Sequence, residues 1–153
     1  MLTAAEAWLP ALKSRNRKAS IFTAPDTAVA LPGLSDDQYR RFTGKYGYLS
    51  GRFVEEMPSG ELMLIPGTQT LWAELRWALR YEQVVHLDDL LLRRTRLGLV
   101  MVEGGMALLP TLRQMALDED WSEERWEAEV SRYRDIWHRY YSVPASVAMA
   151  TAA

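Results

Sequence analysis

Residues 87–98 most constrain what this chain can fold into, because they place a charge on an apolar helical stripe. The segment reads LDDLLLRRTRLG, and in a helix Leu87, Leu90 and Leu91 would share one face at i, i+3, i+4 spacing. The next position on that face is Arg94. A guanidinium among apolar side chains is costly unless an opposite charge pairs with it. The segment therefore predicts a core helix whose arginine needs an anionic partner.

The preceding segment, residues 71–83, offers that partner. Its apolar face continues to Glu82 and is formed by Leu71, Leu75, Ala78 and Leu79. We predict that Glu82 and Arg94 form a buried structural pair where two helices of a bundle meet. The alternative is that Arg94 lays its aliphatic stem along the core and keeps its guanidinium in water.

Capping residues and turns predict helices in the N-terminal half. Ser35 is a favourable N-cap, and Gln38 three residues later completes a capping box. A second helix is expected over residues 48–57. Residues 61–65 are short and extended, and coil is favoured there over a strand because no partner strand is evident.

The C-terminal half shows longer helical periodicity. The helix over 87–97 is expected to run on past Gly98, and the Gly104–Gly105 pair should break it. A helix over 106–116 tolerates Pro110 only near its first turn. Ser122 then caps the longest helix, whose inward stripe steps by four and three residues: Trp126, Val130, Tyr133, Trp137 and Tyr140.

These elements predict an all-α fold, an orthogonal or irregular bundle of five to seven helices with an extended N-terminal arm. Residues 1–33 form the N-terminal segment and linker. Residues 34–144 form the helical domain, and residues 145–153 a disordered tail. There are no internal repeats, and one domain suits a chain of 153 residues.

Composition excludes several classes of protein. The formal net charge is −2, which opposes a general polyanion-binding protein. The chain has no cysteine, so disulfides and thiolate metal sites are excluded. No segment reaches the roughly 18 consecutive apolar residues that a membrane-spanning helix needs.

Residues 73–82 (AELRWALRYE) and 87–98 together resemble a known family, the C-terminal helical domain of FAD-dependent, quinone-linked glycerol-3-phosphate dehydrogenases. The signature is the double-arginine helix that follows a helix ending in glutamate: Asp88, Asp89, Arg93 and Arg94. Residues 27–33 are similar to the linker that enters this domain, and Leu109–Pro110 and residues 120–125 also match. The resemblance covers roughly residues 24 to 140. The family usually has threonine or a similar cap where His86 stands here.

The resemblance implies a parent reaction in which sn-glycerol 3-phosphate is oxidised to dihydroxyacetone phosphate and electrons pass through FAD to quinone. The expected partner is the N-terminal flavin domain of the same parent chain, and residues 1–33 would be the tail of that domain. A homo-oligomer is left open, no nucleic acid is expected, and membrane contact is expected only peripherally through the parent. The expected location is the cytoplasm or the cytoplasmic face of the membrane.

The sequence offers no candidate catalytic, cofactor-binding or metal-binding residue. It has no G-x-G-x-x-G motif, so no dinucleotide cradle is expected, and FAD would belong to the parent enzyme. His86 and His138 are interpreted as surface or cap residues. Arg93 is expected to pair with Asp89, while Arg96 points to solvent; phosphate binding by these arginines is the alternative.

The chain is therefore interpreted as a structural or assembly domain that does not catalyse alone. The alternative is a free-standing helical protein-interaction module. A third hypothesis, nucleic-acid binding through residues 13–18 and 93–96, is opposed by the net charge.

Overall fold

A computed structural model of the chain describes residue 29 and residues 31–143. Within these residues the protein has six α-helices and no strand, which confirms the all-α fold class. The predicted coil near residues 61–65 makes one isolated antiparallel bridge, between Leu64 and Leu71. Residues 13–18, most of the N-terminal arm and the predicted C-terminal tail lie outside the described residues.

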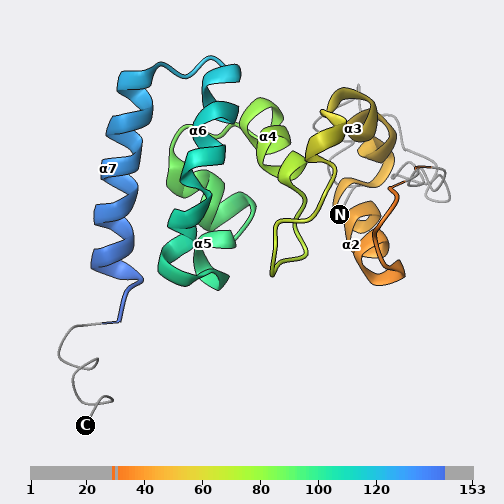
Figure 1. Cartoon of the computed structure of the whole chain (residues 1–153), viewed down its shortest axis with the longest axis horizontal. Coiled ribbons are helices and arrows are strands. Elements are labelled where there is room, and N and C mark those ends of the chain that lie inside the picture. The colour runs from red at the N-terminus through yellow and green to blue at the C-terminus, as the bar shows by residue number, and fades with distance from the viewer. Residues whose placement is uncertain (1–28, 30, 144–153) are drawn as a thin grey trace, which may run out of the picture.

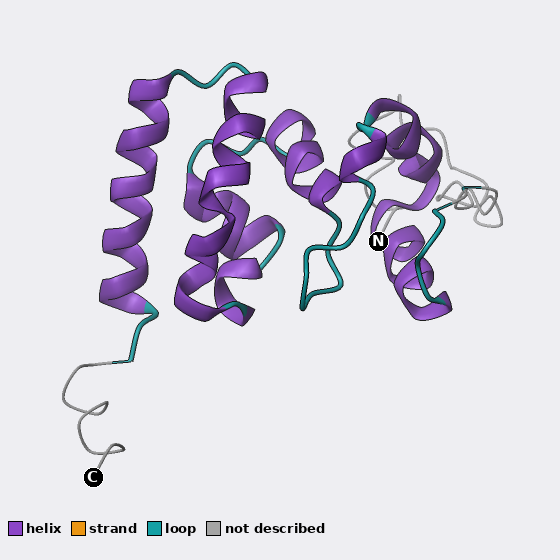
Figure 2. Cartoon of the chain, viewed as in Figure 1, coloured by secondary structure: helices purple, strands orange, loops and turns teal. Residues whose placement is uncertain are grey.

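The helices follow one another along the molecule in chain order, from α2 and α3 at one end to α7 at the other (Figure 1). Helix dominates the described chain, and a long loop over residues 62–71 leads into α4 (Figure 2). The α-helices are α2 (Asp36–Tyr46), α3 (Ser50–Glu56), α4 (Trp72–Tyr81), α5 (Leu97–Val100), α6 (Leu109–Asp118) and α7 (Glu123–Tyr140). The 3₁₀ turns are η1 (Gly47–Leu49), η2 (Ser59–Glu61) and η4 (Val102–Leu108), and η3 (Asp89–Arg94) is a π-helix.

The predicted caps are confirmed. The Ser35 hydroxyl accepts the Gln38 N–H, and the Gln38 side chain accepts the Ser35 N–H at 2.8 Å, so α2 begins with a full capping box. Ser122 accepts the Arg125 N–H at the start of α7. Pro110 lies in the first turn of α6, where its missing N–H costs no helical hydrogen bond.

Helix α4 is shared by two apolar cores. Ala73 and Trp77 face a core made with α2 and α3, which contains Phe42 and Phe53. Leu75 and Ala78 of α4 face a larger core, which is made with the segments from Val84 to Tyr133. A helix that is apolar on several sides belongs inside a fold. Helix α4 therefore joins the two ends of the domain.

The segment after α4 is not the α-helix that the stripe predicts. The Thr95 N–H bonds the Leu90 carbonyl at 3.0 Å, five residues back, which is the π-helical spacing of η3. Each wide turn holds an extra residue, and three successive leucines of η3 are buried: Leu90, Leu91 and Leu92. The predicted continuous helix through Gly98 is interrupted at Arg96, which has a left-handed φ of 59°, and a separate short helix, α5, then carries Gly98.

The connection from α5 to α6 turns sharply against α7. Glu103, Gly104 and Gly105 all have positive φ, which confirms the predicted break. The Tyr133 hydroxyl donates to the Gly104 carbonyl at 2.7 Å. A Cβ on Gly104 would overlap the Trp137 ring, so only glycine lets the connection lie this close to α7.

Candidate functional site

The predicted Glu82–Arg94 pair is wrong. Arg94 is exposed, and Glu82 lies partly exposed at the C-terminal end of α4. The wide turns of η3 are the physical reason. Leu87, Leu90 and Leu91 are buried as the stripe predicts, but the five-residue hydrogen-bond spacing shifts the helical register after them, so Arg94 leaves the apolar face.

The family signature instead forms a cluster around Asp88. This carboxylate is only 3% exposed. It accepts hydrogen bonds from Arg93 and from Arg132 of α7. Burial raises the pKa of Asp88, but the hydrogen bonds from Arg132 and Arg93 outweigh it, so the pKa lies below the usual range. Arg93 also pairs with Asp89, as predicted.

A carboxylate from α7 caps the start of this segment. Glu129 accepts the Leu87 N–H at 3.0 Å, and its other oxygen lies 2.7 Å from His86 Nδ1. The Asp89 carboxylate accepts the His86 N–H at 2.9 Å. His86, expected to be a surface or cap residue, lies partly buried at the cap position and uses its ring to hold Glu129. The hydrogen-bond acceptor that a favourable N-cap residue would supply at position 86 is thus supplied by Glu129 of α7.

The most buried charged side chain described is Glu74 of α4, with no exposed surface. Its carboxylate accepts two hydrogen bonds from Arg41, at 2.8 and 3.0 Å, and one from Lys45 at 3.0 Å. The Tyr46 hydroxyl and the Leu71 N–H also donate to it. Burial raises the pKa of Glu74, but the Arg41 hydrogen bonds and the Lys45 charge hold it below its ordinary value.

A third ionic cluster surrounds Arg76 on the opposite side of α4. Its guanidinium binds Glu61, Asp118 and Glu119. Arg80, one turn later, also pairs with Glu119. The cluster ties α4 to η2 and to the end of α6.

Sequence reasoning missed Glu74, Arg76 and Glu129. Glu74 did leave a signal, because it stands in an apolar run three residues after Leu71, where a glutamate commonly accepts the N-cap N–H. Glu129 and Arg132 left none, because their partners lie more than forty positions away. Of the signature residues, Asp88, Asp89 and Arg93 are brought together, and Arg94 is not.

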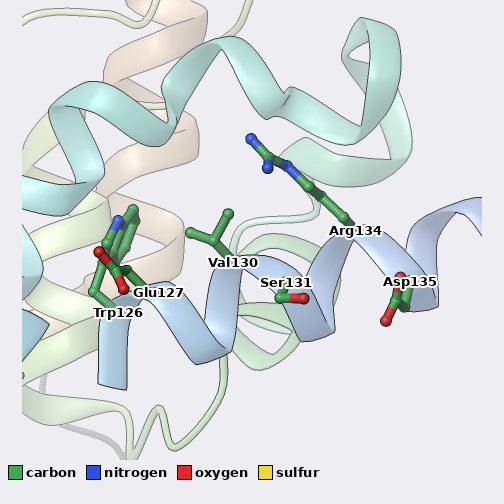
Figure 3. Close-up of a pocket in the computed structure, with 6 residues that line it drawn as sticks. All are labelled: Trp126, Glu127, Val130, Ser131, Arg134 and Asp135. Atoms are coloured by element: carbon green, nitrogen blue, oxygen red, sulfur yellow. The ribbon is translucent and has the colours of Figure 1, made fainter. Parts of the chain in front are cut away.

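A shallow hollow of about 330 Å³ lies along α7. Figure 3 shows Val130 and Arg134 pointing to the same side of the helix. Most of its walls are exposed polar side chains, and its apolar part is Trp126 and Val130. The lining residues are Trp126, Glu127, Val130, Ser131, Arg134 and Asp135.

The described residues do not fit a flavin. Dinucleotide sites use a strand, a glycine turn and a helix N-terminus, and no strand occurs in the described part of the chain. Every buried side-chain nitrogen and oxygen there has a hydrogen-bond partner within the protein. Over the same residues, no group of histidine and carboxylate side chains is arranged to hold a metal ion.

The three ionic clusters are thus networks whose charges satisfy one another. In residues 31–143 no helix has the length and apolar character needed to cross a bilayer. Comparison with curated proteins and with solved structures gave no match. A family model described as the C-terminal domain of alpha-glycerophosphate oxidase matches residues 2–126. The match spans most of the chain and includes the signature segment, and the chain belongs to this family of C-terminal domains.

Proposed function

We propose that this chain is the accessory domain of an FAD-dependent enzyme that oxidises sn-glycerol 3-phosphate to dihydroxyacetone phosphate. In this proposal the flavin and the substrate pocket belong to a separate N-terminal flavin domain, and quinone accepts the electrons. The enzyme works in the cytoplasm or on the cytoplasmic face of the membrane. The observation that carries the proposal is the family match over residues 2–126.

The domain contributes structure and assembly rather than chemistry. Its buried carboxylates, Glu74, Asp88 and Glu129, are all engaged by arginine, lysine, histidine or backbone donors. A general acid or base must reach a substrate proton, and these groups are turned inward. Rigid ionic networks suit a domain that holds a fixed shape against a partner.

Purification from the native host tests the proposal. The protein is tagged at its own locus, isolated gently, and measured for bound FAD and for dye-linked oxidation of sn-glycerol 3-phosphate. We expect both to co-purify with the tag, whether the flavin domain is on the same polypeptide or a separate one. A tagged protein that carries neither flavin nor activity would contradict the proposal and favour the free-standing interaction module.

A matched comparison makes this experiment specific. Asp88→Asn and Arg132→Gln should weaken the fold around the signature segment and lower the amount of recovered flavin. Glu127→Gln, at an exposed position of the same helix, should leave the recovery unchanged. Equal recovery of flavin from all three variants would show that the cluster around Asp88 is not needed for assembly with the flavin domain.

A further inference from the structure

One flank of α7 carries two charges that the rest of the described chain does not neutralise. Glu127 and Arg134 are both exposed, and neither has a hydrogen bond or an ion pair within the part of the chain that the structure describes. The positions three and four residues from Glu127 hold two glutamates and two uncharged residues. Those around Arg134 hold three uncharged residues and His138. The helix itself therefore offers no carboxylate to Arg134 and no cation to Glu127.

The shallow hollow along α7 lies between these two charges. Val130 and Ser131 line it, and along the helix they stand between Glu127 and Arg134, which line it too. Figure 3 shows Val130 and Arg134 on the same side of the helix. Val130 packs partly against the core and Ser131 is short, so α7 leaves room for a neighbouring helix at this point.

The order of the charges is self-complementary. Glu127 precedes Arg134 by seven positions, which is roughly 10 Å along the helix axis. If two copies of α7 lie antiparallel, with a two-fold axis midway between these residues, each Glu127 faces the Arg134 of the other copy. The same axis brings Val130 of each copy against Ser131 of the other. A parallel pair in the same register would instead place like charges opposite each other.

We propose that α7 pairs antiparallel with α7 of a second copy of this chain, through Glu127, Val130, Ser131 and Arg134. Helix α7 lies at one end of the molecule and is the last helix of the described chain (Figure 1). The charges set the orientation and the choice of partner, and the hollow provides contact. Two single helices bury less than the roughly 1,200–2,000 Å² of a stable complex, so the dimer is weak and depends on protein concentration.

This pairing belongs to the chain's own last helix. All four contact residues lie beyond residue 126, where the family model ends. The pairing does not depend on a flavin domain, so it is measured on the chain alone.

Exchange of the two charges tests the pairing in solution. Sedimentation equilibrium of the full chain should show a monomer–dimer equilibrium that shifts toward monomer as salt rises. Glu127→Arg and Arg134→Glu should each weaken the dimer by about tenfold or more, because like charges then face each other. An equimolar mixture of the two variants should recover the dimer, because each charge again meets its opposite.

A matched control accompanies the charge variants. Glu55→Arg makes the same change at an exposed position of α3 and should leave the equilibrium as it is in the wild type. Each variant is first checked for a native circular dichroism spectrum.

The absence of cysteine allows a geometric test as well. Ser131→Cys would lie beside the two-fold axis, so mild oxidation should link two copies through this position. Met63→Cys, at an exposed position on the loop before α4, is the control and should link much more slowly. Glu127→Cys mixed with Arg134→Cys should give the mixed disulfide in preference to either homodimer, which reports the antiparallel direction.

Any of three results would overturn the proposal. The first is a wild-type chain that stays monomeric at every concentration. The second is a dimer that Glu127→Arg and Arg134→Glu leave as strong as in the wild type, which would assign the contact to another part of the chain. The third is a mixture of these two variants that fails to recover the dimer, or a Ser131→Cys chain that links no faster than the Met63→Cys chain.

Discussion

At the residue scale, this chain follows the rule that a buried charge must be paired, but at positions other than those that periodicity selects. The sequence correctly indicates an ionic contact within the core of the bundle. It assigns that contact to Glu82 and Arg94, whereas the structure places it at Glu74 and Asp88. The difference arises because helical periodicity identifies a face, while burial depends on how neighbouring helices cover it.

Truncation of Glu74 tests its role directly. Glu74→Ala leaves Arg41 and Lys45 without their counter-ion and should lower the free energy of unfolding by about 3–5 kcal/mol. Glu82→Ala, the matched control at a partly exposed position, should change it by only a few tenths. Urea denaturation of both variants provides the measurement. A larger loss from Glu82→Ala than from Glu74→Ala would reverse the assignment.

The same carboxylates make stability depend on pH. The pKa values of Glu74 and Asp88 lie below their ordinary values in the folded protein. Groups of this kind stabilise the fold fully above their unfolded pKa values of about 4, and that stability is lost as pH falls through the lower folded values. Unfolding free energy should therefore fall between about pH 5 and pH 2.

The Asp88→Asn variant tests whether Asp88 contributes to this pH dependence of stability. The variant should be less stable than the wild type at pH 7, and its stability should fall less steeply on acidification, because one titrating group is gone. Chemical denaturation at a series of pH values measures both slopes. Parallel slopes for the two proteins would show that Asp88 does not contribute.

At the element scale, helices with explicit start signals could be predicted, and the segment between them could not. Ser35 and Ser122 cap α2 and α7 as expected. The stripe of α7 holds at Trp126 and Tyr133, whereas Tyr140 is exposed past the end of the core. The order of leucines and arginines in η3 is compatible with an α-helix and with a π-helix. The sequence pattern therefore does not distinguish these two kinds of helix.

Gly104 tests how the α5–η4 connection docks on α7. Gly104→Ala adds a methyl group against the Trp137 ring at a positive φ, and should destabilise the domain by about 3 kcal/mol. Gly67→Ala is the control, because it has the same backbone strain but open space around it, and it should cost about 1 kcal/mol. Thermal and urea unfolding measure both. Equal losses would mean that the contact with Trp137 adds nothing.

At the scale of the whole molecule, α4 contributes side chains to both cores, and we expect the two cores to unfold as one cooperative unit. Trp77 lies in the core with α2 and α3, whereas Trp121 and Trp126 lie in the other core. Because α4 contributes to both, unfolding monitored by tryptophan fluorescence and by circular dichroism should give coincident transitions. Two separated transitions would show that the ends of the domain unfold independently.

The limits of sequence reasoning also differ at this scale. The all-α class could be predicted from the helix pattern, and the structure confirms it. The family could be predicted from the signature segment, and the family match confirms it. The Asp88–Arg132 and Leu87–Glu129 contacts could not, because they join segments more than forty residues apart. Arg132 and Glu129 also lie beyond residues 2–126, where the family model ends.

The central claim is that this domain supplies shape and leaves the chemistry to a flavin partner. The most direct test is to purify the chain alone, incubate it with FAD, remove unbound flavin, and measure visible absorbance and dye-linked oxidation of sn-glycerol 3-phosphate. The account predicts no retained flavin and no turnover. A yellow protein that reduces the dye when sn-glycerol 3-phosphate is added would contradict it.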